Sequence, residues 1–174
     1  MNIQGLGAAV LVVAGLLVTS PVMAQPGPGK GPMGRGPGSD TAFVADRDLF
    51  HDLLEHRDDI RRDVKKTDQG VETLTESEKP EVVAAVQKHV ASMEKRVKDK
   101  QPIHLRDPLF AEVFRHTDKI KFVYEKTEKG MRVTETSDDA YVVKLIQAHA
   151  DVVSLFIKNG FDEVRRNHDL PAKP

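Results

Sequence analysis

An internal repeat constrains the fold more than any other feature of this 174-residue chain. Residues 50–94 align without a gap with the residues 60 positions later, and 12 of the 45 aligned pairs are identical. Chance identity of about 6% per position would give roughly three such pairs, so we expect two copies of one structural unit. Identical pairs that recur below are Phe50 with Phe110, His56 with His116, His89 with His149, and Gly70 with Gly130.

Each copy is predicted to begin with an amphipathic helix. In the first copy this helix covers about residues 41–57, and its apolar face repeats at helical spacing. That face consists of Leu49, Leu53, His56 and Ile60, and its counterpart in the second copy is Leu109, Val113, His116 and Ile120. The second helix has a clear start, because Asp107 can cap it and Pro108 suits the first helical position.

A β-hairpin is predicted after each of these helices. Residues 60–66 and 71–76 are rich in Val, Thr and Ile, and they flank a polar stretch that ends in Gly70. This pattern favours a type I turn closed by a left-handed glycine. The second copy repeats it at residues 120–126 and 131–136, and the two hairpins can join as one four-stranded antiparallel sheet.

A long helix should complete each copy, with Ser77 and Ser137 as the expected N-caps. One apolar stripe then holds Val82, Val86, His89, Met93 and Val97, and the other holds Val142, Ile146, His149, Val153 and Ile157. A single αββα unit is too small to bury its own apolar face stably. We therefore predict an α+β fold: a tandem duplication of an αββα unit, with repeats at about 41–100 and 101–160, forming one pseudo-two-fold domain.

The N-terminus has the features of a targeting segment. Residues 1–24 carry no charged side chain, an apolar run of about 13 residues precedes Ser20-Pro21, and Ala24 suits a signal peptidase. The alternative is an uncleaved anchor, but the apolar run is short for a membrane span of about 20 residues. We predict a signal peptide at 1–24, a Gly/Pro-rich disordered linker at 25–40, a folded domain at 41–170, and a periplasmic or secreted protein without a stable membrane span.

Composition excludes several function classes. The net charge is −1, so there is no basic excess to neutralise phosphates, and nucleic acid is not an expected partner. The chain has no cysteine, which excludes thiolate metal sites, disulfides and covalently attached c-type haem. No established catalytic motif occurs. Ser77 and Ser137, which occupy matching positions in the two repeats, are better explained as helix caps than as nucleophiles. An enzyme is therefore not the expected class.

The four repeated histidines, His56, His89, His116 and His149, are the candidate site residues. Periodicity places all four on apolar stripes, where an imidazole must be hydrogen-bonded or ligated. They can bond backbone carbonyls in the core, or a symmetric pair can bind a transition metal or the iron of b-type haem. His89 and His149 are the preferred pair because both lie in mid-helix. If they share one ion, their rings should lie within about 4–5 Å of each other, as metal–nitrogen bonds of about 2.0–2.1 Å require.

The chain resembles a group of small secreted bacterial proteins of uncharacterised function with two helix–hairpin–helix repeats. The resemblance rests on the Gly/Pro-rich start, the paired repeats, the Thr-Glu-Thr-Ser-Asp-Asp run at 134–139 and Leu-Ile-Gln-Ala-His-Ala at 145–150. It covers about 41–170 and implies export and this fold, without catalytic residues. From the sequence we expect an exported, non-enzymatic binding protein for metal or haem; the alternative is a cofactor-free module that binds another envelope protein.

Overall fold

Helices and one antiparallel sheet make up the part of the chain that the computed structural model describes, residues 41–173. The helices are α1 (Thr41–Glu55), α2 (Pro80–Lys98), α3 (Pro108–Arg115), α4 (Ala140–Asn159) and α5 (Phe161–Val164), with short 3-10 helices at Arg57–Asp59 and Thr117–Lys119. The strands are β1 (Ile60–Thr67), β2 (Gly70–Ser77), β3 (Lys121–Thr127) and β4 (Gly130–Thr136). The α+β prediction is confirmed. The predicted signal peptide and linker, 1–24 and 25–40, lie outside the described residues.

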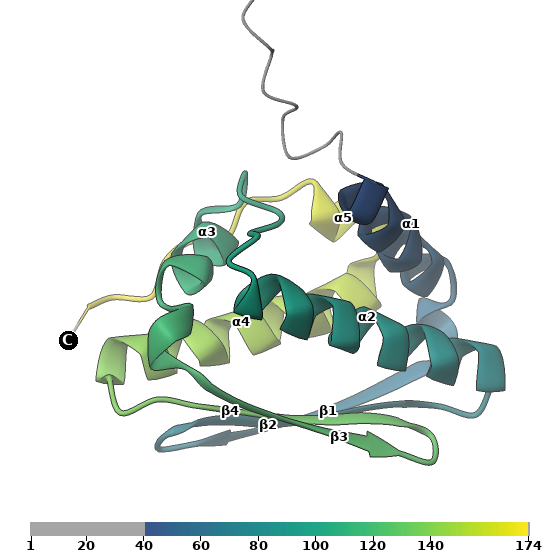
Figure 1. Cartoon of the computed structure of the whole chain (residues 1–174), viewed down its shortest axis with the longest axis horizontal. Helices are drawn as coiled ribbons and strands as arrows, with labels where there is room; N and C mark the ends of the chain where they lie inside the picture. Colours follow the sequence, from purple (N-terminus) through teal and green to yellow (C-terminus); the bar gives the residue numbers. More distant parts are fainter. Residues whose placement is uncertain (1–40, 174) are drawn as a thin grey trace, which may run out of the picture. The chain divides into compact units, whose positions relative to one another are not determined.

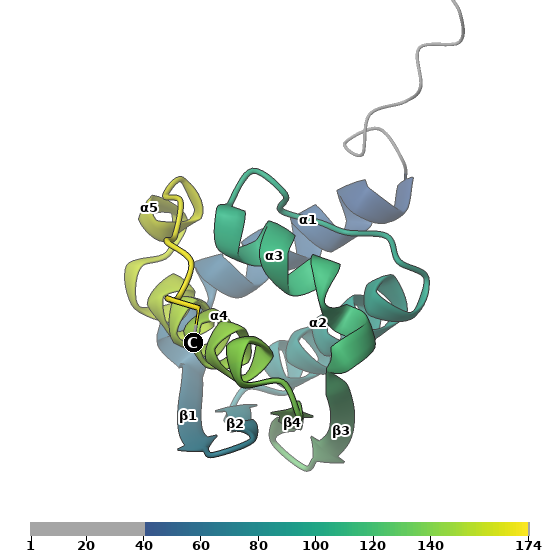
Figure 2. The ribbon, with the colours of Figure 1, turned by 90° about the vertical axis from the view of Figure 1, so that its left-hand side faces the viewer.

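The elements stack in layers on one face of the sheet (Figure 1). The long helices α2 and α4 lie next to the strands, and α1 and α3 lie farther from the sheet (Figure 2). Helix α1 packs on α2, and α3 packs on α4. The four helices thus surround a central region whose floor is the sheet, as the view in Figure 2 makes plain.

The two hairpins join into one sheet of strand order β1-β2-β4-β3. The inner strands β2 and β4 pair antiparallel, with Thr73 opposite Val133 at the middle of the ladder. This confirms that the hairpins form a single four-stranded sheet. Because side chains alternate across a strand, the inward face carries three rows of residues that run across all four strands.

The hairpin turns are tighter than predicted. Thr67 pairs with Gly70, so the loop has two residues rather than four, and Gly70 lies in the strand and not in a left-handed turn. Glycine is needed here for a different reason. A Cβ on Gly70 would lie 1.9 Å from the carbonyl oxygen of Glu135, and one on Gly130 would lie 1.9 Å from that of Thr75. Both glycines allow the close approach of the two hairpins.

Each long helix also holds the hairpin that is distant from it in sequence. Gln87 of α2 donates to the carbonyls of Thr127 and Gly130 in the second hairpin, at 3.2 and 3.0 Å. Gln147 of α4 donates to those of Thr67 and Gly70 in the first, at 2.9 and 3.1 Å. These bonds satisfy carbonyl groups at the turns and lock each half of the domain to the other.

The expected serine caps are wrong in detail. Helix α4 is capped by Asp139, whose carboxylate accepts from the backbone of Tyr141 and Val142, and α2 begins after Lys79. Ser77 and Ser137 each accept a hydrogen bond from the backbone N–H two residues later, at 3.1 Å, and so shape the turn before the helix. The predicted Asp107 cap of α3 is confirmed, since its carboxylate accepts from the backbone N–H of Leu109 at 2.9 Å.

Helix α4 is the central core element. Seven of its side chains are buried, and three of them, Val142, Leu145 and Ile146, are at most 1% exposed. Within residues 41–173 it is the one helix whose length and composition would suffice to cross a membrane, but these apolar side chains pack against the sheet and the other helices. Its hydropathy is therefore explained by its place in the core.

Candidate ligand-binding cavity

A cavity of about 390 Å³ lies between the helices and the inward face of the sheet. Helices α1, α2, α3 and α4 and all four strands contribute side chains to it. Its size falls within the range of about 300–1,000 Å³ that is typical of small-molecule sites, and its walls are predominantly apolar. The central location places it where the two halves of the chain meet.

Aromatic side chains form one wall of the cavity. The ring of Phe156 in α4 lies 5.5 Å from Phe50 in α1 and 5.8 Å from Phe110 in α3, measured between centroids. Phe50 and Phe110 are one of the identical pairs of the repeat, so each half of the chain supplies a phenylalanine to this wall. Such a cluster offers a large apolar surface with defined ring positions.

His89 lines the cavity from α2. Its ring stacks on Phe50 with a centroid distance of 5.9 Å, and its buried Nδ1 has no hydrogen-bond partner among the described residues. Burial lowers the pKa of His89 to about 4, so the imidazole is neutral at neutral pH. A neutral, unpaired ring nitrogen deep in the protein is free to bond a ligand.

His149 occupies the matching position in α4 and lines the same cavity. Its ring meets the face of Phe110 edge-on at 5.0 Å, and burial, with the nearby positive charge of Arg62, lowers its pKa to about 4. The two imidazoles make no ring contact with each other; Phe50, Phe156 and Phe110 connect them in a row of contacts. The structure thus brings the preferred pair to one cavity without direct contact.

His56 and His116 are placed elsewhere. Neither lines the cavity, and the ring nitrogen Nδ1 of each lies at hydrogen-bond distance from a carbonyl of the helix that ends just before it. His56 bonds the carbonyl of Asp52 at 2.9 Å, and His116 bonds that of Glu112 at 3.0 Å. These contacts match the alternative in which a repeated histidine serves the backbone of its own unit.

The floor of the cavity carries a half-buried arginine that the sequence reasoning missed. Arg62 of β1 points inward, and its Nη1 donates to the hydroxyl of Thr75 at 2.6 Å. Its Nε is buried and has no partner among residues 41–173. Burial lowers the pKa of Arg62 to about 10, which leaves the guanidinium charged at neutral pH. One of its five N–H donors is used by Thr75, so the side chain brings unused donors to the lining of the cavity.

A half-buried carboxyl group shares this floor. Glu135 of β4 lines the cavity, yet its carboxyl makes no hydrogen bond or ion pair with any described residue. Burial raises its pKa to about 7, although the charge of Arg62 opposes the shift. Tyr124 of β3 lies nearby, and burial followed by the charge of Glu135 raises the pKa of its hydroxyl. Polar groups from three strands thus line the floor of an otherwise apolar space.

The repeat alignment contains a signal that could have revealed these residues. Arg62 aligns with Phe122, and Glu135 aligns with Thr75. In each pair a charge stands at an inward strand position where the other copy has an uncharged residue. Buried charges are uncommon unless paired, so an inward charge in only one copy marks a functional position. The histidines were singled out instead because they recur at matching positions on the apolar stripes.

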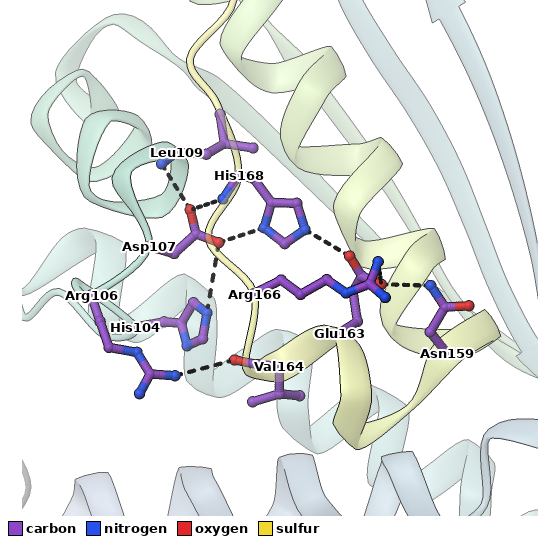
Figure 3. A network of polar contacts seen from close by, with 9 residues as sticks. All are labelled: His104, Arg106, Asp107, Leu109, Asn159, Glu163, Val164, Arg166 and His168. Atoms are coloured by element: carbon purple, nitrogen blue, oxygen red, sulfur yellow. Dashed lines mark hydrogen bonds and ion pairs between the residues drawn. The ribbon is translucent and has the colours of Figure 1, made fainter.

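A second polar network holds the C-terminal segment beside the cavity (Figure 3). His168 lies between two buried carboxylates, with Nδ1 2.6 Å from Asp107 and Nε2 2.9 Å from Glu163. Only the imidazolium can donate to both, so the geometry favours the protonated ring. Burial opposes that charge, but the hydrogen bonds to Asp107 and Glu163 outweigh it and raise the pKa of His168.

The C-terminal network lies beside the helical wall of the cavity and not on the sheet that forms its floor. His104 lies 3.9 Å from Asp107 and lines the cavity, as does Val164, which follows Glu163. No serine, threonine, cysteine or lysine is among the residues drawn in Figure 3. The network therefore fixes the segment that flanks the aromatic wall.

A metal centre built by side chains alone has little support in the described chain. Within residues 41–173, no three His, Cys, Asp or Glu side chains gather closely enough to hold an ion. His89 and His149 would supply at most two nitrogen ligands. Comparison of the chain with protein-family models, with curated proteins and with solved structures finds no match.

Proposed function

We propose that this chain is a non-enzymatic binding protein that holds a small, mostly apolar molecule in the central cavity. The observation that carries the proposal is a cavity of about 390 Å³ in which apolar walls surround polar groups without partners. Leaving such groups unpaired costs about 1–3 kcal/mol each, which a ligand would recover on binding. A site with these features is the default location for ligand binding in a fold of this kind.

His89 and His149 are the proposed ligands if the bound molecule contains a metal. Both are neutral at neutral pH, as coordination by imidazole requires. Since two side chains do not complete a typical protein metal site, we favour a molecule that brings its own donors, such as b-type haem, over a bare ion. His56 and His116 remain lower candidates because their ring nitrogens already contact backbone carbonyls.

Native purification tests the proposal. The protein isolated from its own host should carry a small molecule that native mass spectrometry detects and that denaturation releases. An absorption band typical of haem, lost in His89→Leu or in His149→Leu but kept in His56→Leu, would assign the iron to the histidine whose replacement removes the band. Protein that is empty, and stays empty when offered haemin and apolar organic probes, would refute the binding function and favour the cofactor-free envelope interaction module.

We also propose that the chain is exported, as its N-terminal residues and its resemblance to secreted proteins suggest. Cleavage after Ala24 would leave Gln25 as the first residue of a periplasmic or secreted protein. N-terminal sequencing of the native protein checks this. An intact Met1 in the membrane fraction would contradict it and support the retained anchor.

Duplication of an αββα unit is the proposed origin of the domain. Its support is the 60-residue offset of the identical pairs together with the matched bonds of Gln87 and Gln147 to the opposite hairpins. An experimental structure in which residues 50–97 fail to superpose on 110–157 would contradict it.

A further inference from the structure

We propose that the molecule bound in the cavity is an apolar carboxylic acid, whose carboxylate binds the guanidinium of Arg62 on the floor of the cavity. The inference rests on the proposed binding function and specifies its ligand class. It covers simple aliphatic and aromatic acids as well as haem, which carries carboxylate groups. These sources share one recognition chemistry and are separated by the experiment below.

The guanidinium of Arg62 is suited to bind a carboxylate, and most of its N–H donors have no hydrogen-bond partner among the described residues. It has five N–H donors in a planar fork, and one of them bonds Thr75. Its Nε is buried without a partner in the described chain. Paired N–H donors on one edge of an arginine match the two oxygens of a carboxylate, a charge-assisted contact stronger than a neutral hydrogen bond.

No carboxylate within residues 41–173 forms an ion pair with Arg62. Glu135 is the nearest candidate, but it forms no ion pair or hydrogen bond with Arg62. The sheet register explains this, because Arg62 lies opposite Thr75 whereas Glu135 lies opposite Val71 in another row. The other cavity carboxylate, Asp46, is already bonded by Arg96 and by Ser92. A charged donor thus lines the cavity with a neutral hydroxyl as its acceptor and no carboxylate partner among the described residues.

Protonation of Glu135 further favours an anion over a cation. Its carboxyl has a pKa of about 7, so a large fraction of it is neutral near that pH, while Arg62 stays charged. A neutral carboxyl can donate its own O–H to a bound carboxylate. The apolar walls, led by Phe50, Phe110 and Phe156, in turn exclude a bare inorganic anion, because they offer it no hydrogen bonds.

The test compares three probes that share an alkyl chain and differ in the head group: decanoate, decan-1-ol and decylamine. Isothermal titration calorimetry at about pH 6, below the pKa of Glu135, measures each affinity. Decanoate should bind at least about tenfold more tightly than the alcohol or the amine, since one charge-assisted contact is worth about that factor. This comparison uses the wild-type protein and does not depend on the folding of a variant.

Two adjacent arginines provide the matched variants. Arg62→Met should lower decanoate affinity at least about tenfold and leave decan-1-ol affinity unchanged. Arg61→Met changes the neighbouring arginine, whose side chain is 64% exposed and paired with Glu76, and should change neither affinity. Arg62→Lys keeps the charge but loses the planar fork, so its decanoate affinity should fall between those of the wild type and Arg62→Met.

The outcomes separate the acid preference from the binding function. Equal affinity for decanoate and decan-1-ol, or an equal loss of both in Arg62→Met, would overturn the acid inference while the binding function stands. Failure of every probe and of haemin to bind would overturn both. If haemin binds and His89→Leu removes its iron signal without changing decanoate affinity, Arg62 recognises the carboxylate independently of iron, in support of the inference. Haemin binding that is unaffected by Arg62→Met, with no decanoate binding, would refute it.

Discussion

Acid should destabilise this domain through the two imidazoles of the cavity. His89 and His149 have pKa values of about 4 in the folded protein against 6.5 for an ordinary histidine. Between these values the unfolded chain binds more protons than the folded one, so stability is lost as the pH falls. Each pKa unit corresponds to about 1.4 kcal/mol, which gives a loss of about 2 kcal/mol per imidazole between about pH 7 and about pH 5.

Variants isolate this contribution from other titrating groups. Glu135 acts in the opposite sense, because its raised pKa makes the folded state bind more protons than the unfolded chain, a gain of about 2 kcal/mol over the same interval. The informative quantity is therefore the difference between wild type and variant in the free energy of unfolding that is lost on acidification. His89→Leu and His149→Leu should each reduce the loss on acidification by about 2 kcal/mol, and the double variant by about 4.

Urea unfolding followed by far-UV circular dichroism at the two pH values measures these differences. Met93→Ala is the matched control, since Met93 lines the same cavity one turn after His89 and has no titratable group. It should lower stability equally at both pH values. If His89→Leu loses as much stability on acidification as the wild type, the imidazole is not held neutral by burial, and its proposed role as a free ligand fails with it.

Two further predictions concern the frame of the cavity. Gly70→Ala and Gly130→Ala should each lower the free energy of unfolding by about 3–4 kcal/mol, because the added Cβ meets a backbone oxygen of the neighbouring hairpin. Denaturant unfolding checks this, and a loss below about 1 kcal/mol would show that the hairpins separate easily. His168→Asn should cost about 3 kcal/mol by leaving the buried carboxylates of Asp107 and Glu163 without their shared partner. The raised pKa of His168 makes its contribution present below about pH 6.5 and lost at higher pH, so thermal unfolding of wild type and variant should converge toward alkaline pH.

The repeat made most of the fold predictable. Helical stripes and hairpin patterns at a fixed offset predicted the element order and the joined sheet, since both follow from local periodicity and from the need to bury two small units together. The turn at Gly70 was predicted wrongly because glycine is required there by the close approach of the Glu135 backbone, which is 65 positions away in the sequence. Contacts of this kind depend on tertiary packing, which single-sequence turn rules do not contain.

The candidate site was predictable only in part. His89 and His149 were found because imidazoles on apolar stripes are conspicuous, and both line the cavity. Arg62 and Glu135 were missed because a strand with alternating charges reads as a solvated edge until the sheet register shows which side faces inward. Sequence periodicity specifies alternation, but the inward side follows from the packing of α2 and α4 on the sheet.

The asymmetry of the floor is the strongest argument that the cavity does more than join two similar halves. The frame is matched in both halves: the glycines at the turns, Gln87 with Gln147, and His89 with His149. On the floor, by contrast, the aligned positions differ: Arg62 aligns with Phe122, and Glu135 aligns with Thr75. Stability alone would be served by two apolar rows, because a buried charge costs more than a well-packed apolar side chain. A guanidinium at Arg62 with an apolar side chain at the matching position of the other half suits a ligand that is itself charged at one end, and it gives that ligand one orientation.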